Sequence, residues 1–317
     1  MKAVYLDYQA LDKNDLDFSQ LDEVFAELIL YPMSTPEQVL ERVKDADVII
    51  SNKVVIDSNT IEQCQNLKLI LISATGTNNV DLIKAKEKGV VACNCQGYGT
   101  AAVAQHTMSL MLALATSLLK YDRAVQQGQW NQSPIFCMLG YPIVELSGKT
   151  LGIVGYGELG QAVAKLAEAF GMKVLVAALP NRPSDASRVP FHELLTQVDF
   201  LSLHCPLTEE TRDLIGEKEF NLMKNSAFLI NCARGGVVNE AALKNALLDR
   251  QIAGAAMDVL TVEPPKNGNI LLDPTIPNLI ITPHSAWGSV DARQRIVNQM
   301  LENVQGFIAG KIIRQVN

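Results

Sequence analysis

The chain has 317 residues, of which 48% are hydrophobic and 19% are charged, and its formal net charge is −7. This length is enough for two domains with separate hydrophobic cores. The negative charge, with no block of Lys and Arg, excludes a nucleic-acid partner, because binding to phosphates needs clustered cations.

The N-terminal part of the chain is predicted to alternate strands with helices. Short apolar runs predict parallel strands at residues 2–6, 48–51, 69–73 and 90–94. Helical spacing of apolar residues predicts helices at residues 37–44, 58–64 and 80–88. This alternation is typical of an α/β domain. Acidic residues soon after the first strand leave no room for a signal peptide, so we expect a cytoplasmic protein.

The stretch from residue 100 to residue 119 is mostly apolar and is uncharged when His106 is neutral. Its length would allow a helix to span a bilayer. It also contains polar side chains, among them Gln105, Thr107 and Ser109, which lipid disfavours. We therefore expect a long helix buried between domains or between subunits, and no membrane partner.

A second α/β unit starts near residue 149. Apolar runs predict strands at residues 150–154, 173–178, 200–204, 227–231, 254–259 and 279–282. Helical pieces between these strands indicate a doubly wound sheet. A last helix, predicted at residues 290–309, is expected to return to the first domain.

These patterns predict two Rossmann-like, doubly wound parallel-sheet domains of the α/β class with an interdomain cleft. We expect residues 1–98 with 288–317 to form one domain, and residues 99–287 to form the other. Crossings near Gly97 and Gly288 would serve as hinges. The ligand is expected in the cleft.

The six cysteines show no C-x-x-C pair and no paired metal-ligand spacing. Such a pattern is typical of buried free thiols in a reducing compartment. We expect neither a disulfide nor a bound metal.

A glycine motif, Gly155-Tyr156-Gly157-Glu158-Leu159-Gly160, joins the predicted strand 150–154 to a helical segment. The first glycine permits a tight turn, the second lets the backbone approach a pyrophosphate, and the third lets helix pack close to strand. Unpaired N–H groups at the helix N-terminus would bind the anion. Because strand, turn and helix follow in this order, the motif predicts a dinucleotide site rather than a turn without a ligand.

Three polar residues follow predicted strands of the second unit: Arg234, Glu263 and His284. Each has a structural explanation alone, as a surface charge, a loop residue or a strand-end hydrogen-bonder. Open parallel sheets bind ligands at the carboxyl ends of their strands, so all three at one edge predict an active site. A histidine can act as a general acid near neutral pH, and the planar guanidinium of Arg234 suits a carboxylate.

These motifs resemble, in order and spacing, those of the D-isomer-specific 2-hydroxyacid dehydrogenases, and the resemblance covers nearly the whole chain. The matching segments of the second unit are the glycine turn, Cys232-Ala233-Arg234-Gly235, Ala256-Met257-Asp258-Val259 with Glu263-Pro264, and Pro283-His284. Earlier in the chain, residues 75–81 resemble the family's substrate loop, and Gln105-His106-Thr107 resembles the start of its interdomain helix.

The resemblance implies that Arg234, Glu263 and His284 are the catalytic residues. Glu263 would hold the second ring nitrogen of His284 and stabilise its imidazolium form. Substrate would be bound by Thr75, Gly76, Arg234 and His284, with the backbone N–H groups of Thr75 and Gly76 on the substrate carboxylate. The resemblance thus implies that residues 1–98 with 288–317 form a flavodoxin-like, substrate-binding lid domain and that residues 99–287 form a dinucleotide-binding Rossmann domain. Domain closure would then bring the substrate to the cofactor.

The resemblance also implies the cofactor contacts. They are Thr75, Gly155, Gly157, Glu158, Leu159, Gly160, Cys205, Pro206, Cys232, Ala233, Arg234, Asp258 and His284. Glu158 and Leu159 would lie along the pyrophosphate, and Asp258 at the carboxamide. Packing at strand ends explains Cys205 and Cys232 at least equally well, because a backbone contact does not need the thiol.

The cofactor is expected to be NAD or NADP. An NAD site usually has an acidic residue about 20 residues beyond the glycines, and this chain has Ala178 in that region. The missing carboxylate removes repulsion against a 2′-phosphate, and Arg182 could pair with one, which favours tolerance of NADP. The alternative is that Arg182 is a solvated loop residue and the site takes either cofactor.

The resemblance implies an enzyme that interconverts a short D-2-hydroxy acid and its 2-oxo acid. Tyr141-Pro142 and Ala286-Trp287 favour D-glycerate and hydroxypyruvate, with glyoxylate also reduced. D-lactate and D-3-phosphoglycerate remain alternative substrates, whereas Glu263 counts against formate dehydrogenation. An alternative from another class is a non-catalytic, dinucleotide-sensing scaffold.

A homodimer is the expected assembly, mainly by resemblance. The apolar helix from Thr100 and the segment 130–141, with Phe136 and Met138, offer surface that a monomer would leave exposed. The alternative is that these residues pack between the domains.

Overall fold

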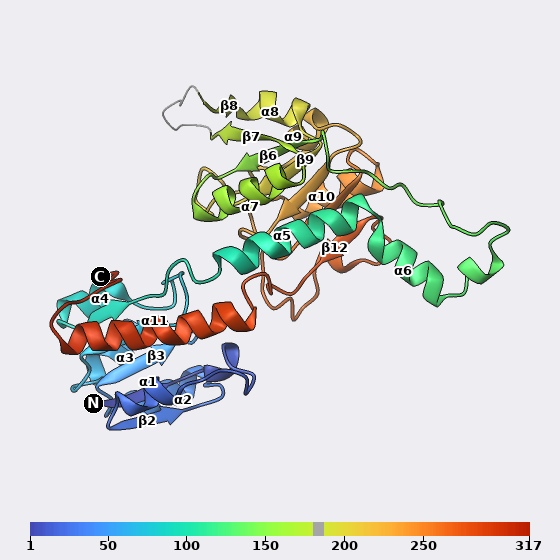
Figure 1. The fold of residues 1–317 in the computed structure, drawn as a ribbon. Coiled ribbons are helices and arrows are strands. Elements are labelled where there is room, and N and C mark those ends of the chain that lie inside the picture. The colour runs from blue at the N-terminus through green and yellow to red at the C-terminus, as the bar shows by residue number, and fades with distance from the viewer. Residues whose placement is uncertain (180–186) are drawn as a thin grey trace. The chain divides into compact units, whose positions relative to one another are not determined.

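The computed structural model describes residues 1–179 and 187–317. These residues form two compact units, the first made of Met1–Gly99 and Gly288–Asn317 and the second of Thr100–Trp287. Figure 1 shows each unit as a sheet with helices around it. The boundaries expected from the sequence, after residues 98 and 287, lie at or next to these limits.

The first unit is built on a five-stranded sheet in the order β2-β1-β3-β4-β5, with every pairing parallel. Its strands are β1 (Lys2–Tyr5), β2 (Glu27–Leu30), β3 (Val48–Ser51), β4 (Leu69–Ile72) and β5 (Val91–Cys93). Every residue of β3 and β4 is buried, as expected for central strands with both faces covered.

Apart from the short first helix, which Phe18 precedes, the helices of the first unit begin at residues suited to capping. They are α1 (Ser19–Glu23), α2 (Pro36–Val43), α3 (Ser58–Gln63), α4 (Leu82–Glu87) and α11 (Val290–Ile308), with a 3-10 turn at Tyr8–Ala10. The Asp57 carboxylate accepts the Thr60 N–H at 2.8 Å. Asp81 does the same for the Lys84 N–H at 2.9 Å. Both bonds satisfy backbone donors that the first helical turn leaves unpaired.

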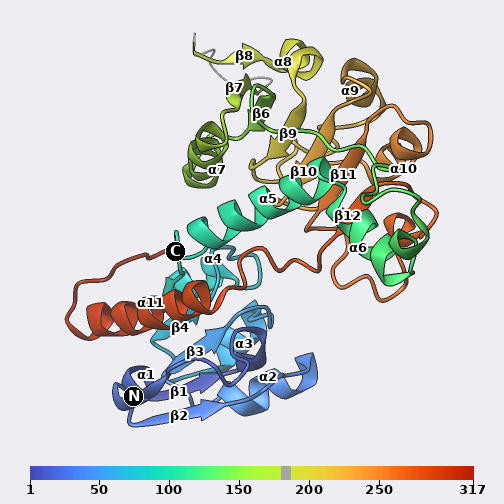
Figure 2. The same ribbon diagram turned by 45° about the vertical axis from the view of Figure 1, so that its right-hand side comes forward.

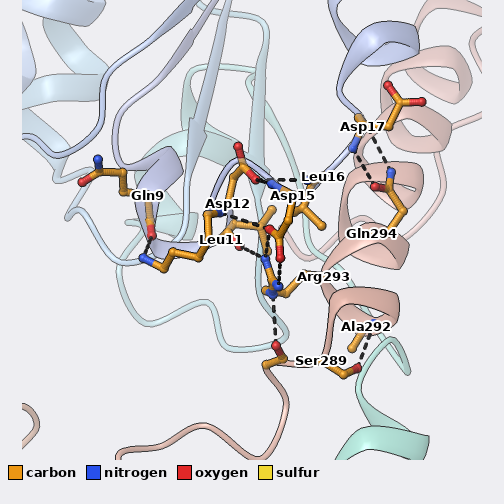
Figure 3. Close-up of polar contacts among 12 residues, drawn as sticks. Gln9, Leu11, Asp12, Asp15, Leu16, Asp17, Ser289, Ala292, Arg293 and Gln294 are labelled. Atoms are coloured by element: carbon orange, nitrogen blue, oxygen red, sulfur yellow. Dashed lines mark hydrogen bonds and ion pairs between the residues drawn. The ribbon is translucent and has the colours of Figure 1, made fainter.

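Helix α11 is fastened to the loop after β1 by a buried arginine. Arg293 is 8% exposed, and its guanidinium donates to both carboxylate oxygens of Asp15, at 2.7 and 2.6 Å, and to the Leu11 carbonyl at 3.0 Å (Figure 3). Its Nε also donates to the Gly288 carbonyl at 3.0 Å. Arg293 therefore orders both the start of α11 and the residue at which the chain re-enters this unit.

The second unit is built on a parallel sheet whose seven described strands have the order β12-β11-β10-β9-β6-β7-β8. They are β6 (Thr150–Val154), β7 (Lys173–Ala178), β8 (Val189–Pro190), β9 (Phe200–Leu203), β10 (Phe228–Asn231), β11 (Gly254–Met257) and β12 (Leu279–Ile281). The order turns back between β6 and β9, which makes the sheet doubly wound and confirms the expected fold class.

Apolar clusters cover both faces of this sheet. The helices are α5 (Thr100–Ala115), α6 (Leu118–Gln126), α7 (Glu158–Ala169), α8 (Phe191–Gln197), α9 (Glu217–Leu222) and α10 (Glu240–Leu248), with 3-10 turns at Trp130–Gln132 and Ile270–Leu272. Helices α5 and α7 contribute to one cluster and α8, α9 and α10 to the other. Figures 1 and 2 show α5 beside α7 against the sheet.

The structure differs from the sequence expectations in some details. The helix expected over residues 100–119 is broken, because Ser117 adopts a φ of +52° and its hydroxyl donates to the Pro142 carbonyl at 2.7 Å. No single described helix is long and apolar enough to cross a membrane, and α5 and α6 pass that test only as a pair bent by 62°. The edge strand Glu27–Leu30 was missed because its two ends are exposed and one is charged.

Candidate active site

The glycine turn joins β6 to α7, and each of its glycines meets a different requirement. Gly155 has a φ of +95°, and a Cβ there would lie 2.6 Å from the Cys205 amide nitrogen. A Cβ on Gly160 would lie 2.2 Å from the Gly155 carbonyl oxygen. Chain neighbours aside, no described atom comes within 4 Å of a Cβ placed on Gly157. The fold therefore requires the first and third glycines, whereas the second leaves open space.

This open space lies at the N-terminus of α7, where Gly157 is the N-cap and no described side chain caps the helix. The first N–H groups of a helix lack intrahelical partners and favour an anion. The Glu158 carboxylate is turned toward α5, where it accepts the Thr100 hydroxyl at 2.6 Å. The residues present thus fit a dinucleotide pyrophosphate, contacted by backbone rather than by the Glu158 carboxylate.

Cys205 and Cys232 follow β9 and β10, and both residues are buried, 2% and 7% exposed. All six cysteines lie within the described residues, and none forms a disulfide. Burial raises the pKa of the Cys232 thiol to about 12. The thiols are therefore part of the packing, and the cofactor contacts expected of Cys205, Pro206, Cys232 and Ala233 stay predictions for their backbone.

Asn231, at the end of β10, shapes the turn that carries Arg234. Its side-chain oxygen accepts the Ala233 N–H and its side-chain nitrogen donates to the Arg234 carbonyl, both at 3.0 Å. Arg234 is exposed, and one guanidinium N–H donates to the Ala233 carbonyl at 2.7 Å. A Cβ on Gly235 would lie 1.9 Å from the Leu260 carbonyl oxygen, so this turn packs directly on the loop after β11.

Glu263, on that loop, holds the imidazole of His284, which follows β12. The distance from His284 Nδ1 to Glu263 Oε2 is 2.6 Å, and the side chains are 35% and 32% exposed. The other carboxylate oxygen accepts the Leu260 N–H at 2.8 Å. Burial raises the pKa of Glu263, but the bonds from His284 and Leu260 outweigh burial and lower that pKa below its usual value.

Ionised Glu263 makes Nδ1 the protonated position of a neutral His284 ring, since a carboxylate only accepts hydrogen bonds. Nε2 is then the atom through which His284 exchanges a proton with a ligand. Strands β10, β11 and β12 are neighbours, and Arg234, Glu263 and His284 follow their carboxyl ends. The sheet thus gathers the three residues expected from the sequence at one edge.

Asp258 lies immediately after β11 and is almost fully buried. Its 1% exposed side chain accepts the Ser285 N–H at 2.9 Å on Oδ1 and the Ala286 N–H at 3.0 Å on Oδ2. The Thr282 hydroxyl donates to Oδ1 at 2.5 Å. Burial raises the pKa of Asp258, yet bonds from His106, Thr282 and these N–H groups lower it overall. The carboxylate is thus directed at the turn that carries His284, and the expected carboxamide contact stays a prediction.

Other predictions concern residues elsewhere in the chain. Thr75 and Gly76 belong to the first unit, where the Thr75 carbonyl accepts the Asn94 side-chain amide at 2.8 Å. Arg182 lies outside the described residues, whereas Ala178 is the last residue of β7. Within the described ranges, no group of His, Cys, Asp or Glu side chains could hold a metal ion.

Three residues of the site were missed as functional candidates: Asn231, Thr282 and His106. Asn231 and Thr282 are polar residues at strand ends, the same signal that identified Arg234. His106 is the single titratable residue in the sequence of α5, and its Nε2 lies 3.1 Å from Thr282 Oγ1. A polar residue inside an apolar helix was the signal available for it.

A dinucleotide-type glycine turn at one sheet edge with a carboxylate-supported histidine and an exposed arginine defines a nicotinamide-dependent dehydrogenase. The family model "D-isomer specific 2-hydroxyacid dehydrogenase, NAD binding domain" matches residues 108–286. The chain belongs to the D-isomer specific 2-hydroxyacid dehydrogenase family. It is accordingly an oxidoreductase that acts on the CH–OH group of a small 2-hydroxy acid with a nicotinamide dinucleotide.

Comparison with individual proteins agrees with this assignment. The chain is 45% identical to a glycerate dehydrogenase of Methylorubrum extorquens, over 98% of this chain and 97% of that protein. It is 37% identical to a hydroxypyruvate reductase of Blautia hydrogenotrophica, over 100% of both. Its fold matches the solved structure of a D-2-hydroxyisocaproate dehydrogenase with a TM-score of 0.85 and 26% identity, over 100% and 99% of the two chains.

Proposed function

We propose that this protein reduces hydroxypyruvate to D-glycerate, and glyoxylate to the corresponding hydroxy acid, and catalyses the reverse reactions. The observation that carries the proposal is the 2.6 Å contact between His284 Nδ1 and Glu263 Oε2. A proton donor held in this way at the edge of a dinucleotide-binding sheet suits reduction of a ketone. The choice of substrate is supported by the relatives named glycerate dehydrogenase and hydroxypyruvate reductase.

In the proposed reaction, His284 Nε2 gives its proton to the carbonyl oxygen of the 2-oxo acid. Glu263 stabilises the imidazolium form before transfer and keeps Nδ1 protonated after it. Arg234 binds the substrate carboxylate and polarises the adjacent carbonyl. When bound, the reduced nicotinamide supplies the hydride that reaches the carbonyl carbon. The product is the 2-hydroxy acid, with a new C–H and a new O–H bond.

Thr75 and Gly76 are the residues of the first unit to which we assign part of the substrate binding. Their support is the resemblance of residues 75–81 to the substrate loop of the family. The same applies to the assignment of the first unit as the substrate-binding domain and of the second as the dinucleotide-binding domain.

A panel of substrates tests the proposal. Steady-state rates are measured with hydroxypyruvate, glyoxylate, pyruvate and 3-phosphohydroxypyruvate. We expect the largest kcat/KM with hydroxypyruvate, and preference for pyruvate or the phosphorylated acid would reassign the enzyme as a D-lactate or D-3-phosphoglycerate dehydrogenase. Tight dinucleotide binding without turnover on any of them would indicate a sensing scaffold instead. His284→Ala should lower kcat by at least about 100-fold, the scale of general acid catalysis, with cofactor binding retained.

For the cofactor, we propose that NADPH is accepted together with NADH. The support is Ala178 at the end of β7, where an acidic side chain would repel a 2′-phosphate. Arg182 is assigned to the phosphate on sequence grounds alone. A kcat/KM for NADH at least about tenfold above that for NADPH would contradict this part of the proposal; tenfold is about 1.4 kcal/mol.

We further propose that the protein is a cytoplasmic homodimer. Apolar side chains of α6 and the segment after it are exposed, including Leu118 at 57%, Phe136 at 91% and Leu139 at 74%. A monomer would leave this surface in water, at a cost in solubility. The six cysteines without a disulfide suit a reducing compartment. Elution at the mass of one 34.6 kDa chain would contradict the dimer.

A further inference from the structure

Helix α5 carries one titratable side chain in its sequence, His106, and aims it at the sheet edge that holds the active site. Its Nε2 lies 3.1 Å from Thr282 Oγ1 and 3.5 Å from Asp258 Oδ1, and the side chain is 23% exposed. The rest of the helix contacts α7 and the strands β10 and β11 through small and apolar residues. His106 is therefore a polar contact placed within an apolar interface.

The hydrogen bonds in this cluster have a defined direction. The Thr282 hydroxyl donates its proton to Asp258 Oδ1, at 2.5 Å, because an ionised carboxylate only accepts. Thr282 Oγ1 is then the acceptor for His106, so the proton of the His106 ring lies on Nε2. His106, Thr282 and Asp258 form a chain of donors that ends on the buried carboxylate.

The same carboxylate holds the turn on both sides of the His284 side chain. It accepts the N–H groups of Ser285 and Ala286, and the His284 N–H donates to the Asp258 backbone carbonyl at 2.8 Å. His284 has a φ of +53°, a left-handed conformation that costs free energy for a residue with a Cβ. Such a conformation persists where surrounding contacts enforce it, and here the enforcing group is Asp258.

Asp258 depends in turn on its donors. It is 1% exposed, and the negative charges of Asp258 and Glu263 repel each other, since Asp258 acts to raise the pKa of Glu263. A buried carboxylate is stable only when hydrogen bonds or opposite charge compensate its lost hydration. The donor that α5 supplies to this cluster is His106.

We propose that His106 is a positioning residue for His284, acting through Thr282 and Asp258 to hold the strained turn that aims the imidazole. This inference rests on the proposed function for its kinetic consequence, but its structural content does not depend on which substrate is turned over. His106 itself touches neither substrate nor cofactor in this role.

Two substitutions separate the role of the donor from that of the ring. His106→Gln keeps an N–H group near the position of Nε2, whereas His106→Leu removes it. Ser109→Ala on the exposed side of α5 is the matched control. We expect His106→Leu to lower kcat for hydroxypyruvate about tenfold, the effect of one lost hydrogen bond to a charged cluster, with little change in KM. His106→Gln should stay within about threefold of the original protein, and Ser109→Ala within about twofold.

Rates are expressed per folded site, counted from the stoichiometry of NADH binding by fluorescence. This correction removes any loss that comes from unfolding alone. The inference is wrong if His106→Leu keeps kcat within twofold, or if His106→Gln is as damaged as His106→Leu. Thr282→Val removes the hydroxyl that joins His106 to Asp258 and should lower kcat as much as His106→Leu does. Thr282→Ser keeps the hydroxyl and should be more active than Thr282→Val.

A spectroscopic measurement tests the inference without turnover. The chain has 4 histidines, so the ring nitrogens can be resolved by NMR of protein with 15N-labelled histidine, with His284→Ala identifying the relevant signals. We expect His106→Leu, but not His106→Gln, to shift the His284 signals. Unchanged His284 signals in His106→Leu would overturn the inference even if the enzyme prefers another acid. Absence of turnover by the unsubstituted protein would overturn the proposed function alone.

Discussion

Replacement of Glu263 by Gln isolates the electrostatic support of His284, the proposed proton donor. The change is nearly isosteric, but it removes a charge and leaves one acceptor oxygen where the structure uses two. Glu263 now accepts His284 Nδ1 at 2.6 Å and the Leu260 N–H at 2.8 Å. An amide can satisfy one of these donors with its oxygen and must turn its NH2 group toward the other.

The size of the expected loss in kcat/KM follows from the hydrogen bond between Glu263 and His284 and from the exposure of the two side chains to solvent. A hydrogen bond to a charged group contributes about 1.5–3 kcal/mol, and the two side chains are 35% and 32% exposed, so solvent screening places the loss near the lower end. At about 1.4 kcal/mol per factor of ten, kcat/KM should fall about 10- to 30-fold. Because the pKa of Glu263 is lowered, its carboxylate stays charged at neutral pH, so the difference should persist across about pH 6–8.

The assay is the initial rate of hydroxypyruvate reduction, together with the Kd of NADH from fluorescence. Glu240→Gln is the matched control, because Glu240 accepts the Thr261 N–H at 2.7 Å and the Asn269 side chain at 2.8 Å on the same loop without contacting His284. We expect this control to lower the melting temperature and to leave kcat/KM within about threefold. The reasoning is refuted if Glu263→Gln stays within threefold of the original enzyme, or if both substitutions reduce kcat/KM equally.

Three further predictions concern the cofactor site and stability. Gly157→Ala should weaken NADH binding at least about tenfold, because the added methyl enters open space in which the pyrophosphate would lie. The melting temperature of the protein without cofactor should not change. An unchanged affinity for NADH in a titration would contradict this prediction. Ala178→Asp should lower kcat/KM for NADPH at least about tenfold more than for NADH, because the new carboxylate repels the 2′-phosphate. Equal effects on both cofactors would show that the 2′-phosphate does not lie near residue 178. The hydrogen bonds from Arg293 lower the pKa of Asp15 to about 2, so its contribution to stability is complete above its unfolded pKa of about 4 and is lost as pH falls toward 2. In Asp15→Asn, the free energy of unfolding, measured with urea, should therefore fall less steeply as pH is lowered. An unchanged dependence on pH would show that the Arg293 contact does not persist in solution.

Much of the fold and of the active site could be predicted from local sequence patterns. Buried parallel strands appear as short apolar runs, and the glycine turn combines strand, turn and helix within a few residues. Arg234, Glu263 and His284 could be grouped before their geometry was known, because the carboxyl ends of neighbouring parallel strands lie at one edge of the sheet. In the sheet of the second unit, the strands that precede these residues, β10, β11 and β12, are neighbours.

Local patterns failed where the signal was weak or the conformation unusual. The edge strand Glu27–Leu30 has exposed ends, and a short edge strand need not show an apolar run. The helix expected to reach residue 119 ends early because Ser117 adopts a positive φ and bonds to Pro142, which is 25 residues later in the chain. Nothing in the neighbouring sequence indicates that bond.

The sequence by itself thus determined the doubly wound architecture and the glycine turn, and it indicated the side chains to which we assign catalysis, because each depends on residue type and spacing along one segment. The tertiary structure decided how those side chains are held. The Asp258 carboxylate bonds to residues up to 28 positions away, and His106 reaches Thr282 across 176 positions. Hydrogen bonds over such separations depend on how segments pack in three dimensions, and no pattern within a single segment records that packing.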